Sequence, residues 1–518
     1  MTELVRGTPG LVRAVNDRAA LHLLLRQGPL TRPEISRLTG LSKPTASQVL
    51  ARLEGAGLVV GNGLRTGLPG RVPETYRVNA EAAYATAVDV TPDRIAVRTA
   101  DITGAVLGEA EAPVPAGPGR EALVEALRSA LALAPAPRPP RRVVVGVQGA
   151  VDPTTGRLAY ASEEDMAAWL FPDVERSLGE ALGLPVRIEN DVNLAAVAER
   201  AHAAADCPDF VLLWADEGLG AALVIGGRLH RGHFGGAGEV GYLPLPGAPT
   251  AREAGHPYGR HGYQELAGGD AIRDLLHAHG IPGTDFAETV TEAVRRAGAG
   301  AWTGAGARAG AGVRTGAEAG PGSAVGAGAG AWTGTGAEVW TGSGAGAGTG
   351  TGAGSGTAVG AGAGVLTGAR TEALPETGTW AGTGTGTGSG TEAGTGTGVE
   401  AGSGTGTGIE AGTGTGESVE AARAGLAVVA ARLASGLASI VTVVDPGLVV
   451  LAGRLCAAGG EPLRALVERE LHVLTHSRAR IRLSAVTGNP VLAGALDLAL
   501  TAARDEVFGG PPPVTHCP

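Results

Sequence analysis

Residues 31–50, with the sequence TRPEISRLTGLSKPTASQVL, limit the fold more than any other stretch, because they predict a complete helix-turn-helix. Thr31 and Glu34 have the spacing of a capping box at the start of one helix. Gly40 supplies a residue that can take positive φ at the turn. Ser42 then caps a second helix. We interpret the stretch as the part of a DNA-binding domain that recognises the base sequence.

The second helix has an apolar face and a polar, basic face. Ala46, Val49, Leu50 and Leu53 are predicted to face inward. We expect the other face to enter the major groove. The residues assigned to DNA contact there are Ser42, Lys43, Thr45, Ser47, Gln48 and Arg52.

Two neighbouring helices are expected to pack against it. Ile35 and Leu38 give the first helix of the motif an inward face. Upstream, a further helix has apolar residues at a spacing of three or four, which predicts its packing face. Those residues are Val12, Val15, Ala19 and Leu23.

Strands predicted at 58–60 and 75–78 flank a loop rich in Gly and Arg, which is typical of the wing of a winged helix. Arg65 and Arg71 in this loop are candidates for contact with a phosphate or a narrow minor groove. The prediction is a winged helix-turn-helix DNA-binding domain over residues 1–80, with more basic than acidic side chains.

The composition excludes several other classes. A net charge of −10 over 518 residues argues against general coating of nucleic acid, so DNA contact should be local to this domain. The three cysteines are far apart, which supports neither a disulfide scaffold nor a zinc finger. The apolar run from Ala421 is interrupted by Arg423 and Arg432, which argues against a membrane span. We expect a cytoplasmic protein.

Residues 298–416 consist mainly of Gly-Ala and Gly-Thr dipeptides. Such a composition cannot bury enough apolar surface to offset the entropy of ordering the backbone, so we predict a disordered insertion. Helical patterns flank it at 271–297 and 419–437, so it interrupts one domain.

The remaining chain alternates strands and helices, which predicts an α/β fold. A helix is expected at 121–133. Strands are expected at 85–90, 95–100, 142–147, 186–189, 210–214, 221–225 and 448–451.

Four motifs follow one another in this body: GVQGAVDPTTGRL at 146–158, ENDVNLAAVAER at 189–200, EGLGAALVIGGRLHRG at 217–232 and GAGEVGY at 236–242. With the preceding helix-turn-helix they resemble the ROK family of repressors, open reading frames and sugar kinases. The resemblance implies an actin-like (ribonuclease-H-like), two-lobed sugar kinase fold. It implies an N-terminal lobe at 84–200 and a C-terminal lobe at 201–297 and 417–508.

The chain departs from the kinase pattern where the family binds nucleotide phosphates. The first phosphate turn reads Asp-Val-Thr-Pro-Asp at 89–93, with Pro92 removing an N–H donor. The second begins with Asp216 and Glu217, whose charges would repel a triphosphate. We therefore expect no ATP binding, no cofactor and no enzymatic activity.

The resemblance implies a sugar site at Asn190, Asp191, Glu239 and Glu265, with Asp191 at the position of the kinase base. Carboxylates and amides suit polyols because each can bridge adjacent hydroxyls.

The family's zinc-ligand positions read Tyr242, His256, Tyr258 and Tyr263, so no metal is expected.

The leading hypothesis is a sugar-responsive transcriptional regulator, a repressor of carbohydrate uptake or catabolism genes. It would bind operator DNA as a homodimer or homotetramer and respond to a sugar or sugar phosphate. Two alternatives stay open: a ROK-type sugar kinase that kept a DNA-binding head, and a regulator that binds no ligand.

Overall fold

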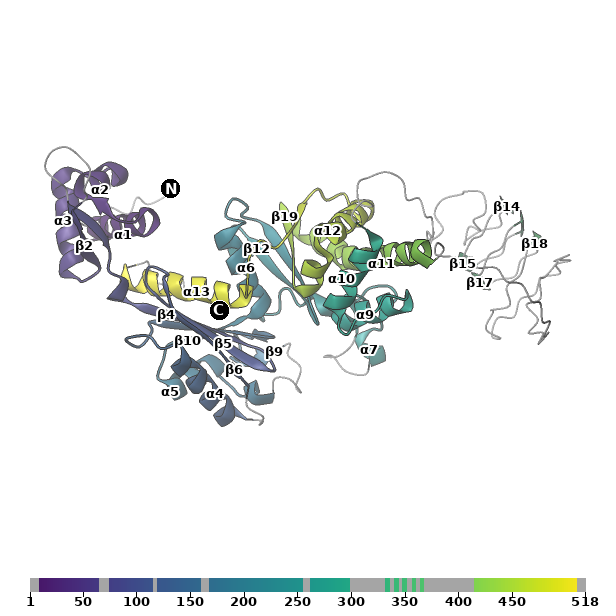
Figure 1. Cartoon of the computed structure of the whole chain (residues 1–518), viewed down its shortest axis with the longest axis horizontal. Coiled ribbons are helices and arrows are strands. Elements are labelled where there is room, and N and C mark those ends of the chain that lie inside the picture. The colour runs from purple at the N-terminus through teal and green to yellow at the C-terminus, as the bar shows by residue number, and fades with distance from the viewer. Residues whose placement is uncertain are drawn as a thin grey trace, which may run out of the picture. The chain divides into compact units, whose positions relative to one another are not determined.

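The computed structural model describes residues 9–64, 74–114, 119–159, 167–254, 261–298 and 414–509, together with short strands between residues 331 and 367. The chain forms two compact units, one of residues 1–302 and 411–518 and one of residues 303–410. The first unit contains an N-terminal head and a two-lobed body (Figure 1).

The head is a winged helix-turn-helix. Its helices are α1 (Pro9–Gln27), α2 (Arg32–Thr39) and α3 (Lys43–Gly55), and its strands are β1 (Leu30–Thr31), β2 (Val59–Leu64) and β3 (Glu74–Val78). The strands form an antiparallel sheet in the order β1-β3-β2. The predicted wing loop between β2 and β3 lies outside the described residues.

The predicted turns of the head are confirmed. Thr31 and Glu34 form the reciprocal capping box, and Gly40 takes φ 73° at the end of α2. Ser42 accepts a hydrogen bond from the backbone N–H of Thr45. The residues of α3 predicted to be buried, Ala46, Val49, Leu50 and Leu53, are all buried.

The predicted packing face of α1 is wrong for most of its length. Val12 and Val15 are more than half exposed, and Leu38 of α2 is also exposed. The core instead takes Leu21 and Leu24 of α1 together with Leu23. The reason is that only the C-terminal half of α1 has α2 and α3 to pack against.

The N-terminal lobe holds a mixed sheet in the order β10-β7-β4-β5-β6. Its strands are β4 (Tyr84–Val90), β5 (Arg94–Asp101), β6 (Val106–Pro113), β7 (Arg142–Val147) and β10 (Val186–Asn190). Helices α4 (Arg120–Leu133) and α5 (Val174–Leu182) share a core with one face. A hairpin of β8 (Ala150–Val151) and β9 (Leu158–Ala159) follows β7.

The C-terminal lobe holds a second mixed sheet in the order β13-β12-β11-β19-β20. Its strands are β11 (Phe210–Ala215), β12 (Leu219–Ile225), β13 (Arg228–His230), β19 (Leu448–Ala452) and β20 (Arg480–Leu483). Helices α9 (Gly269–Ala278), α10 (Phe286–Ala297), α11 (Gly414–Val444) and α12 (Arg454–Leu474) share its large core. Short helices α7 (Ala251–Ala254) and α8 (Tyr263–Ala267) precede α9.

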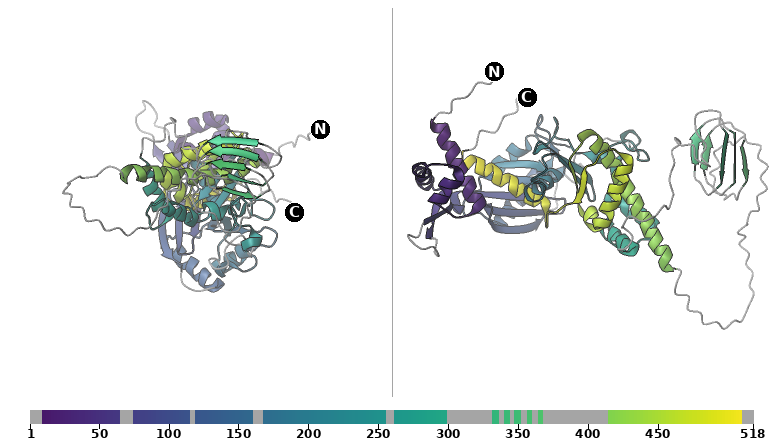
Figure 2. Two further views of the ribbon diagram at one scale, coloured as in Figure 1. Left: turned by 90° about the vertical axis from the view of Figure 1, so that its right-hand side faces the viewer. Right: turned by 90° about the horizontal axis from the view of Figure 1, so that it is seen from above.

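Two helices connect the parts of this unit. Helix α6 (Asp191–His202) contacts β12 of the second sheet and packs closely against α13 (Pro490–Val507). Helix α13 crosses the face of the first sheet, where it packs on β4 and β7 (Figures 1 and 2). Residues 490–507 thus pack with the N-terminal lobe, whereas the sequence pattern placed them in the C-terminal lobe.

Helix α11 is long and apolar enough over Ser418–Val444 to cross a membrane by length and composition. In the structure it is a core helix, because Leu426, Leu433 and Leu437 are fully buried among its neighbours. Arg432 donates a hydrogen bond to the carbonyl of Leu266 at 2.8 Å, which satisfies the charged side chain inside the lobe.

The described residues of the second unit form short strands, and the predicted disorder of residues 298–416 stays a prediction. Strands β14 (Ala331–Thr335), β16 (Ala347–Thr351) and β18 (Gly364–Thr367) pair in parallel, as do β15 (Trp340–Ser343) and β17 (Gly356–Val359). The repeated Gly-Thr dipeptides allow this pairing, since backbone ladders need no large side chains.

Candidate functional site

The outer face of α3 presents polar side chains at the position of a recognition helix. Ser42, Lys43, Ser47 and Gln48 are exposed, and Thr45 is half-buried. The Oγ atoms of Ser42 and Thr45 lie 2.8 Å apart, so these two hydroxyls are partly used in capping the helix. Lys43, Ser47 and Gln48 make no such contact and are the side chains that α3 can offer to a base edge or a phosphate.

Arg52 does not belong to this surface. Its Nη2 lies 2.6 Å from Oδ1 of Asp17 on α1, and its Nε donates to the other oxygen at 3.2 Å. The guanidinium of Arg52 joins α3 to α1 in this structure, and its contact with DNA stays a prediction. Arg65 and Arg71 lie outside the described residues, and their role stays a prediction.

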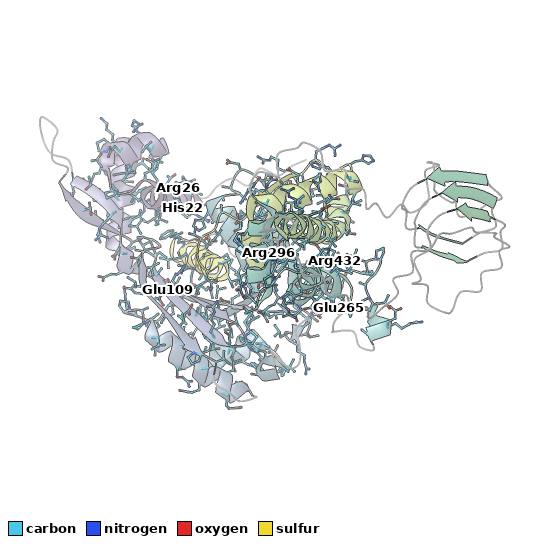
Figure 3. The ribbon with its side chains drawn as sticks, turned by 45° about the vertical axis from the view of Figure 1, so that its right-hand side comes forward. His22, Arg26, Glu109, Glu265, Arg296 and Arg432 are labelled. Atoms are coloured by element: carbon cyan, nitrogen blue, oxygen red, sulfur yellow. The ribbon has the colours of Figure 1, made fainter. Side chains whose placement is uncertain are left out.

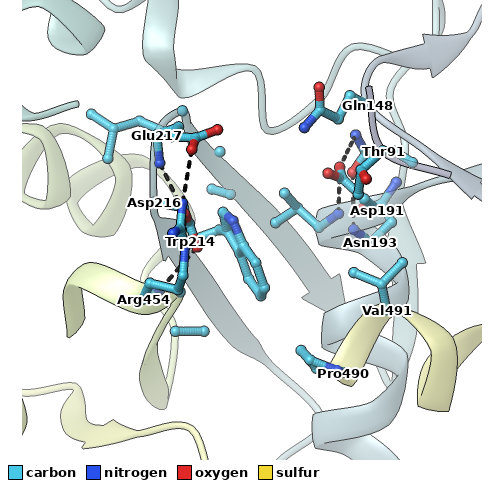
Figure 4. A pocket seen from close by; sticks show the side chains of 18 of the residues that line it. Thr91, Gln148, Asp191, Asn193, Trp214, Asp216, Glu217, Arg454, Pro490 and Val491 are labelled. Atoms are coloured by element: carbon cyan, nitrogen blue, oxygen red, sulfur yellow. Dashed lines mark hydrogen bonds and ion pairs between the residues drawn. The ribbon is translucent and has the colours of Figure 1, made fainter. Parts of the chain in front are cut away.

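A cleft of about 1260 Å³ lies in the body. Its walls come from the first lobe at Asp89–Arg94 and Asn190–Asn193, from the second lobe at Trp214–Ala221, and from the start of α13 at Asn489–Val491. In Figure 4, Asp216, Glu217 and Arg454 lie on one side and Thr91, Gln148, Asp191 and Asn193 on the other.

Asn190 and Asp191 stand where β10 ends and α6 begins. The side-chain oxygen of Asn190 accepts from the backbone N–H of Asn193 at 2.9 Å, and its amide donates to the carbonyl of Gly149 at 3.2 Å and to Asp191 at 3.0 Å. Asp191 Oδ1 also accepts from the N–H of Val192 at 2.8 Å. Asn190 is therefore largely a capping and positioning residue, and Asp191 presents its second carboxylate oxygen, Oδ2, for a ligand.

Glu239 and Asn193 are two further polar groups of the cleft with unused hydrogen-bonding capacity. The carboxylate of Glu239 makes no hydrogen bond or ion pair with any described residue, although it lines the cleft. The side-chain oxygen of Asn193 is buried without a partner, while its amide donates to Glu189 at 3.0 Å. Unused buried acceptors are costly unless a ligand or water satisfies them.

Glu265 is not brought to this cleft. It lies on α8 in the C-terminal lobe (Figure 3), and the neighbouring Gln264 lines the cleft in its place. Gln264 accepts from the N–H of Leu219 and donates to the carbonyl of Glu217, both at 2.8 Å. A sugar contact by Glu265 stays a prediction.

Three carboxyls of the cleft, those of Asp191, Glu239 and Asp89, have raised pKa values. Burial raises the pKa of Asp191 to about 7, and the charges of Asp89 and Asp216 add to the rise. Burial and the nearby charge of Asp191 raise the pKa of Glu239 to about 8. Burial also raises the pKa of Asp89, against the hydrogen bond from Asn489 and the charge of Arg94.

The turn at residues 89–93, at the position of the family's first phosphate turn, is held by hydrogen bonds among its own residues. The N–H of Thr91 donates to the carbonyl of Arg94 at 2.9 Å, and the Thr91 hydroxyl donates to Asp93 at 2.7 Å. Pro92 has no N–H. The turn therefore has neither the glycines nor the free donors that phosphate binding requires.

At the position of the family's second phosphate turn, Asp216 and Glu217 form ion pairs with Arg454. Arg454, the first residue of α12, donates its backbone N–H to Asp216 Oδ2 at 3.0 Å and its Nε to Asp216 Oδ1 at 2.8 Å. Its Nη2 donates to Glu217 at 2.9 Å. A carboxylate thus holds the start of α12, where an anion is stabilised by free N–H groups and the helix dipole.

The zinc-ligand positions do not fit a metal. Tyr263 is fully buried and donates its hydroxyl to the carbonyl of Leu433 at 2.8 Å, so this position serves packing. His261 is buried with its ring 5.3 Å from that of Tyr242. His256 and Tyr258 lie outside the described residues, among which no group of His, Cys, Asp and Glu is arranged to hold a metal.

Sequence reasoning missed three residues of the cleft: Asn193, Arg454 and Asn489. Asn489 caps α13 and donates to the buried Asp89 at 2.7 Å. The Asn-Pro pair at 489–490 was an available signal, since Asn before Pro is typical of a helix start. Arg454 had no such signal, because its partners lie more than two hundred residues earlier in the chain.

The raised carboxyl pKa values predict a distinctive pH dependence of stability. The unfolded chain ionises these groups near their ordinary values of 3.8 and 4.5, whereas the folded chain keeps the protons up to about 7 and 8. Between those limits the unfolded state binds fewer protons, so the free energy of unfolding falls as the pH rises. We expect Asp191→Asn to remove part of this fall, on the order of 2 kcal/mol. Thermal unfolding at a series of pH values measures it, and parallel curves for both proteins would contradict the assignment.

Two family models match the chain. A model described as the ROK family matches residues 85–300, and a model described as the MarR family matches residues 15–63. The second match falls within the head, and the first covers the cleft residues up to Gln264.

Curated proteins and a solved structure are also similar. A putative xylose repressor of Caldicellulosiruptor sp. (strain Rt8B.4) is 27% identical over 46% of this chain and 61% of its own length. The DNA-binding transcriptional dual regulator NagC of Escherichia coli K12 is 25% identical over 46% of this chain and 59% of its own length. The chain thus spans about three-fifths of these relatives. A ROK family transcriptional regulator, a homologue of the E. coli MLC protein, has a TM-score of 0.57 at 13% identity, covering 96% of this chain and all of that one. This likeness confirms the predicted fold.

Proposed function

We propose that the chain, whose body matches the ROK family model at residues 85–300 and whose head matches the MarR family model at residues 15–63, is a sugar-responsive DNA-binding transcriptional regulator. It would repress genes of carbohydrate uptake or catabolism from the cytoplasm. Its partners would be operator DNA, a sugar effector and a second copy of the chain, in a dimer or tetramer. The relatives named as xylose repressor and as NagC support the regulatory class.

The observation that carries the proposal is the outer face of α3. Lys43, Ser47 and Gln48 are exposed next to one another on a capped helix, while the opposite face is completely buried. This is the arrangement in which the first turns of a recognition helix reach base edges in the major groove. Selection of bound duplexes from a random DNA pool by the full chain tests it. Recovery of an inverted repeat supports the proposal, and recovery of unrelated sequences contradicts it.

Helix α13 offers a physical route from the cleft to the head. At its start, Asn489 bonds to Asp89 in the cleft floor. At its end, Asp505 pairs with Arg18 of α1 at 2.6 Å, and the ring of Phe508 lies edge-on to His22 at 6.0 Å. One buried cluster includes both Leu24 of α1 and Leu500 of α13. A ligand that shifts Asn489 would therefore act on the head through one rigid helix.

This route gives a testable variant. Arg18→Ala removes the ion pair at the far end of α13 but touches neither the cleft nor α3. We expect sugar affinity to stay unchanged and the sugar-induced change in operator affinity to fall by at least half. Fluorescence anisotropy of labelled operator with and without sugar measures it. The matched control is Arg469→Ala, which breaks an exposed pair with Glu470 in α12. A full sugar response in Arg18→Ala would contradict this route.

A sugar kinase that kept a DNA-binding head is the second candidate, and the raised pKa of Asp191 is the observation in its favour, since it suits a general base. The closed Thr91 turn and the Asp216–Arg454 pair argue against it. We expect no sugar-dependent ADP release across hexoses, pentoses and amino sugars in a coupled assay. ADP release that Asp191→Asn abolishes would overturn the regulator reading in favour of the kinase.

A further inference from the structure

The charges around the cleft define what kind of sugar it can hold. Among the described residues that line it, acidic side chains outnumber basic ones by six to two, and still by four to two without Asp191 and Glu239, which keep their protons up to about pH 7 and 8. The acidic residues are Asp89, Asp93, Asp191, Asp216, Glu217 and Glu239, and the basic ones are Arg94 and Arg454. A cleft of this balance has a negative potential, which disfavours an anionic ligand.

Both arginines are already paired within the protein. Arg454 is held by Asp216 at 2.8 Å and by Glu217 at 2.9 Å. Arg94 pairs with Glu111 at 3.1 Å and with Asp89 at 3.5 Å. A phosphate that recruited either guanidinium would have to displace a carboxylate and leave it unpaired next to the new anion.

The helix starts that line the cleft are also capped from within the chain. Asn190 caps α6, Asn489 caps α13, and Asp216 accepts the first N–H of α12. Each cap uses one of the N–H groups that otherwise form anion sites at helix N-termini.

Two of the groups left for a ligand are hydrogen-bond acceptors. Glu239 has no partner among the described residues, and the side-chain oxygen of Asn193 is buried with 2% of the residue exposed and no partner. Both suit the hydroxyl or ammonium groups of a sugar, which donate hydrogen bonds. Neither suits a phosphate oxygen.

From these observations, and resting on the proposed function, we infer that the effector is a sugar without a phosphate group and that sugar phosphates are excluded by the charge of the cleft. An amino sugar in its ammonium form meets the same acceptors and the same negative potential, and it binds more tightly than its N-acetylated form.

Isothermal titration calorimetry on the full chain tests this with matched pairs. The probes are glucose and mannose with their 6-phosphates, xylose with its 5-phosphate, and glucosamine with N-acetylglucosamine and the 6-phosphates of both. For whichever free sugar binds, we expect its phosphate to bind at least ten-fold more weakly and the ammonium form to bind best within the amino-sugar set. A phosphate that binds as tightly as its parent sugar, or more tightly, overturns the inference while leaving the proposed function intact. If no sugar and no sugar phosphate binds, both fail.

One variant tests whether the charge or the shape of the cleft excludes sugar phosphates. Glu217→Gln removes one carboxylate from the Arg454 pair at the edge of the cleft, where the Glu217 side chain is 80% exposed. If charge excludes phosphates, the affinity of the sugar phosphate relative to the free sugar rises several-fold in Glu217→Gln. An unchanged ratio shows that shape excludes them and overturns the electrostatic explanation. The matched control is Glu470→Gln in α12, outside the cleft lining, whose carboxylate is also paired with an arginine.

Discussion

A chain carrying Gln48→Ala is expected to lose about 2 kcal/mol of discrimination between its operator and unrelated DNA, the typical value of a two-point contact to a base. Gln48 is exposed on α3 beside Ser47, and no described residue competes for its amide. Affinity for unrelated DNA should hardly change, because that affinity comes from phosphate contacts. Anisotropy titrations with operator and scrambled duplexes at fixed salt concentration measure the difference.

Two variants serve as controls for this result. Lys43→Ala should weaken binding to both duplexes about equally and lower the salt dependence, as expected for a phosphate contact. Arg52→Ala should lower the stability of the head by up to about 1 kcal/mol, because it breaks the pair with Asp17. The assignment of α3 as the recognition helix fails if Gln48→Ala keeps full discrimination or if Arg52→Ala alone removes it.

The second large effect is expected in the cleft. Asp191→Ala should weaken sugar binding by about 2 kcal/mol, or about 30-fold, because it leaves sugar hydroxyls without a charged acceptor. Operator binding without sugar should be unchanged, since Asp191 lies in α6 of the body, where its carboxylate bonds to Asn190 and Val192. Calorimetry with the sugar that binds the wild type measures the loss.

Glu265 provides the matched comparison for Asp191. The family resemblance implies that Glu265 binds the sugar, whereas the structure leaves it out of the cleft lining. We expect Glu265→Ala to bind the sugar within about two-fold of the wild type. A loss as large as that of Asp191→Ala would show that α8 moves to bring Glu265 to the sugar. Equal sugar affinity in Asp191→Ala and the wild type would remove Asp191 from the site.

The local signals in the sequence predicted the head well. Capping at Thr31, Gly40 and Ser42 depends on residues a few positions apart, and the buried face of α3 follows from its own periodicity. The predicted packing face of α1 was wrong. Several apolar stripes are available on that helix, and which one is buried depends on the elements that pack against it. The pair between Arg52 and Asp17 was missed for a similar reason, since the pattern of α3 contains no information about a residue on another helix.

In the body, too, local signals predicted the elements, whereas contacts between distant residues were not predicted. Its seven predicted strands match β4, β5, β7, β10, β11, β12 and β19, because continuous apolar runs are clear signals of buried strands. Strand β6 was missed, since much of it is exposed and its pattern is polar. The motif residues Asn190, Asp191 and Glu239 do line one cleft. The contacts that close the nucleotide side depend on Arg454, which only the tertiary structure brings to Asp216.

The most direct test of the central claim is the operator dissociation constant measured with and without sugar, for the wild type and for Asp191→Ala in parallel. The regulator account predicts that saturating sugar changes the wild-type constant by at least five-fold, the lower end of typical coupling between two sites. It also predicts that Asp191→Ala has the wild-type constant without sugar and no response at the same sugar concentration. The account would be contradicted if no sugar changed the operator dissociation constant of the wild type. It would also be contradicted if sugar changed this constant equally in Asp191→Ala.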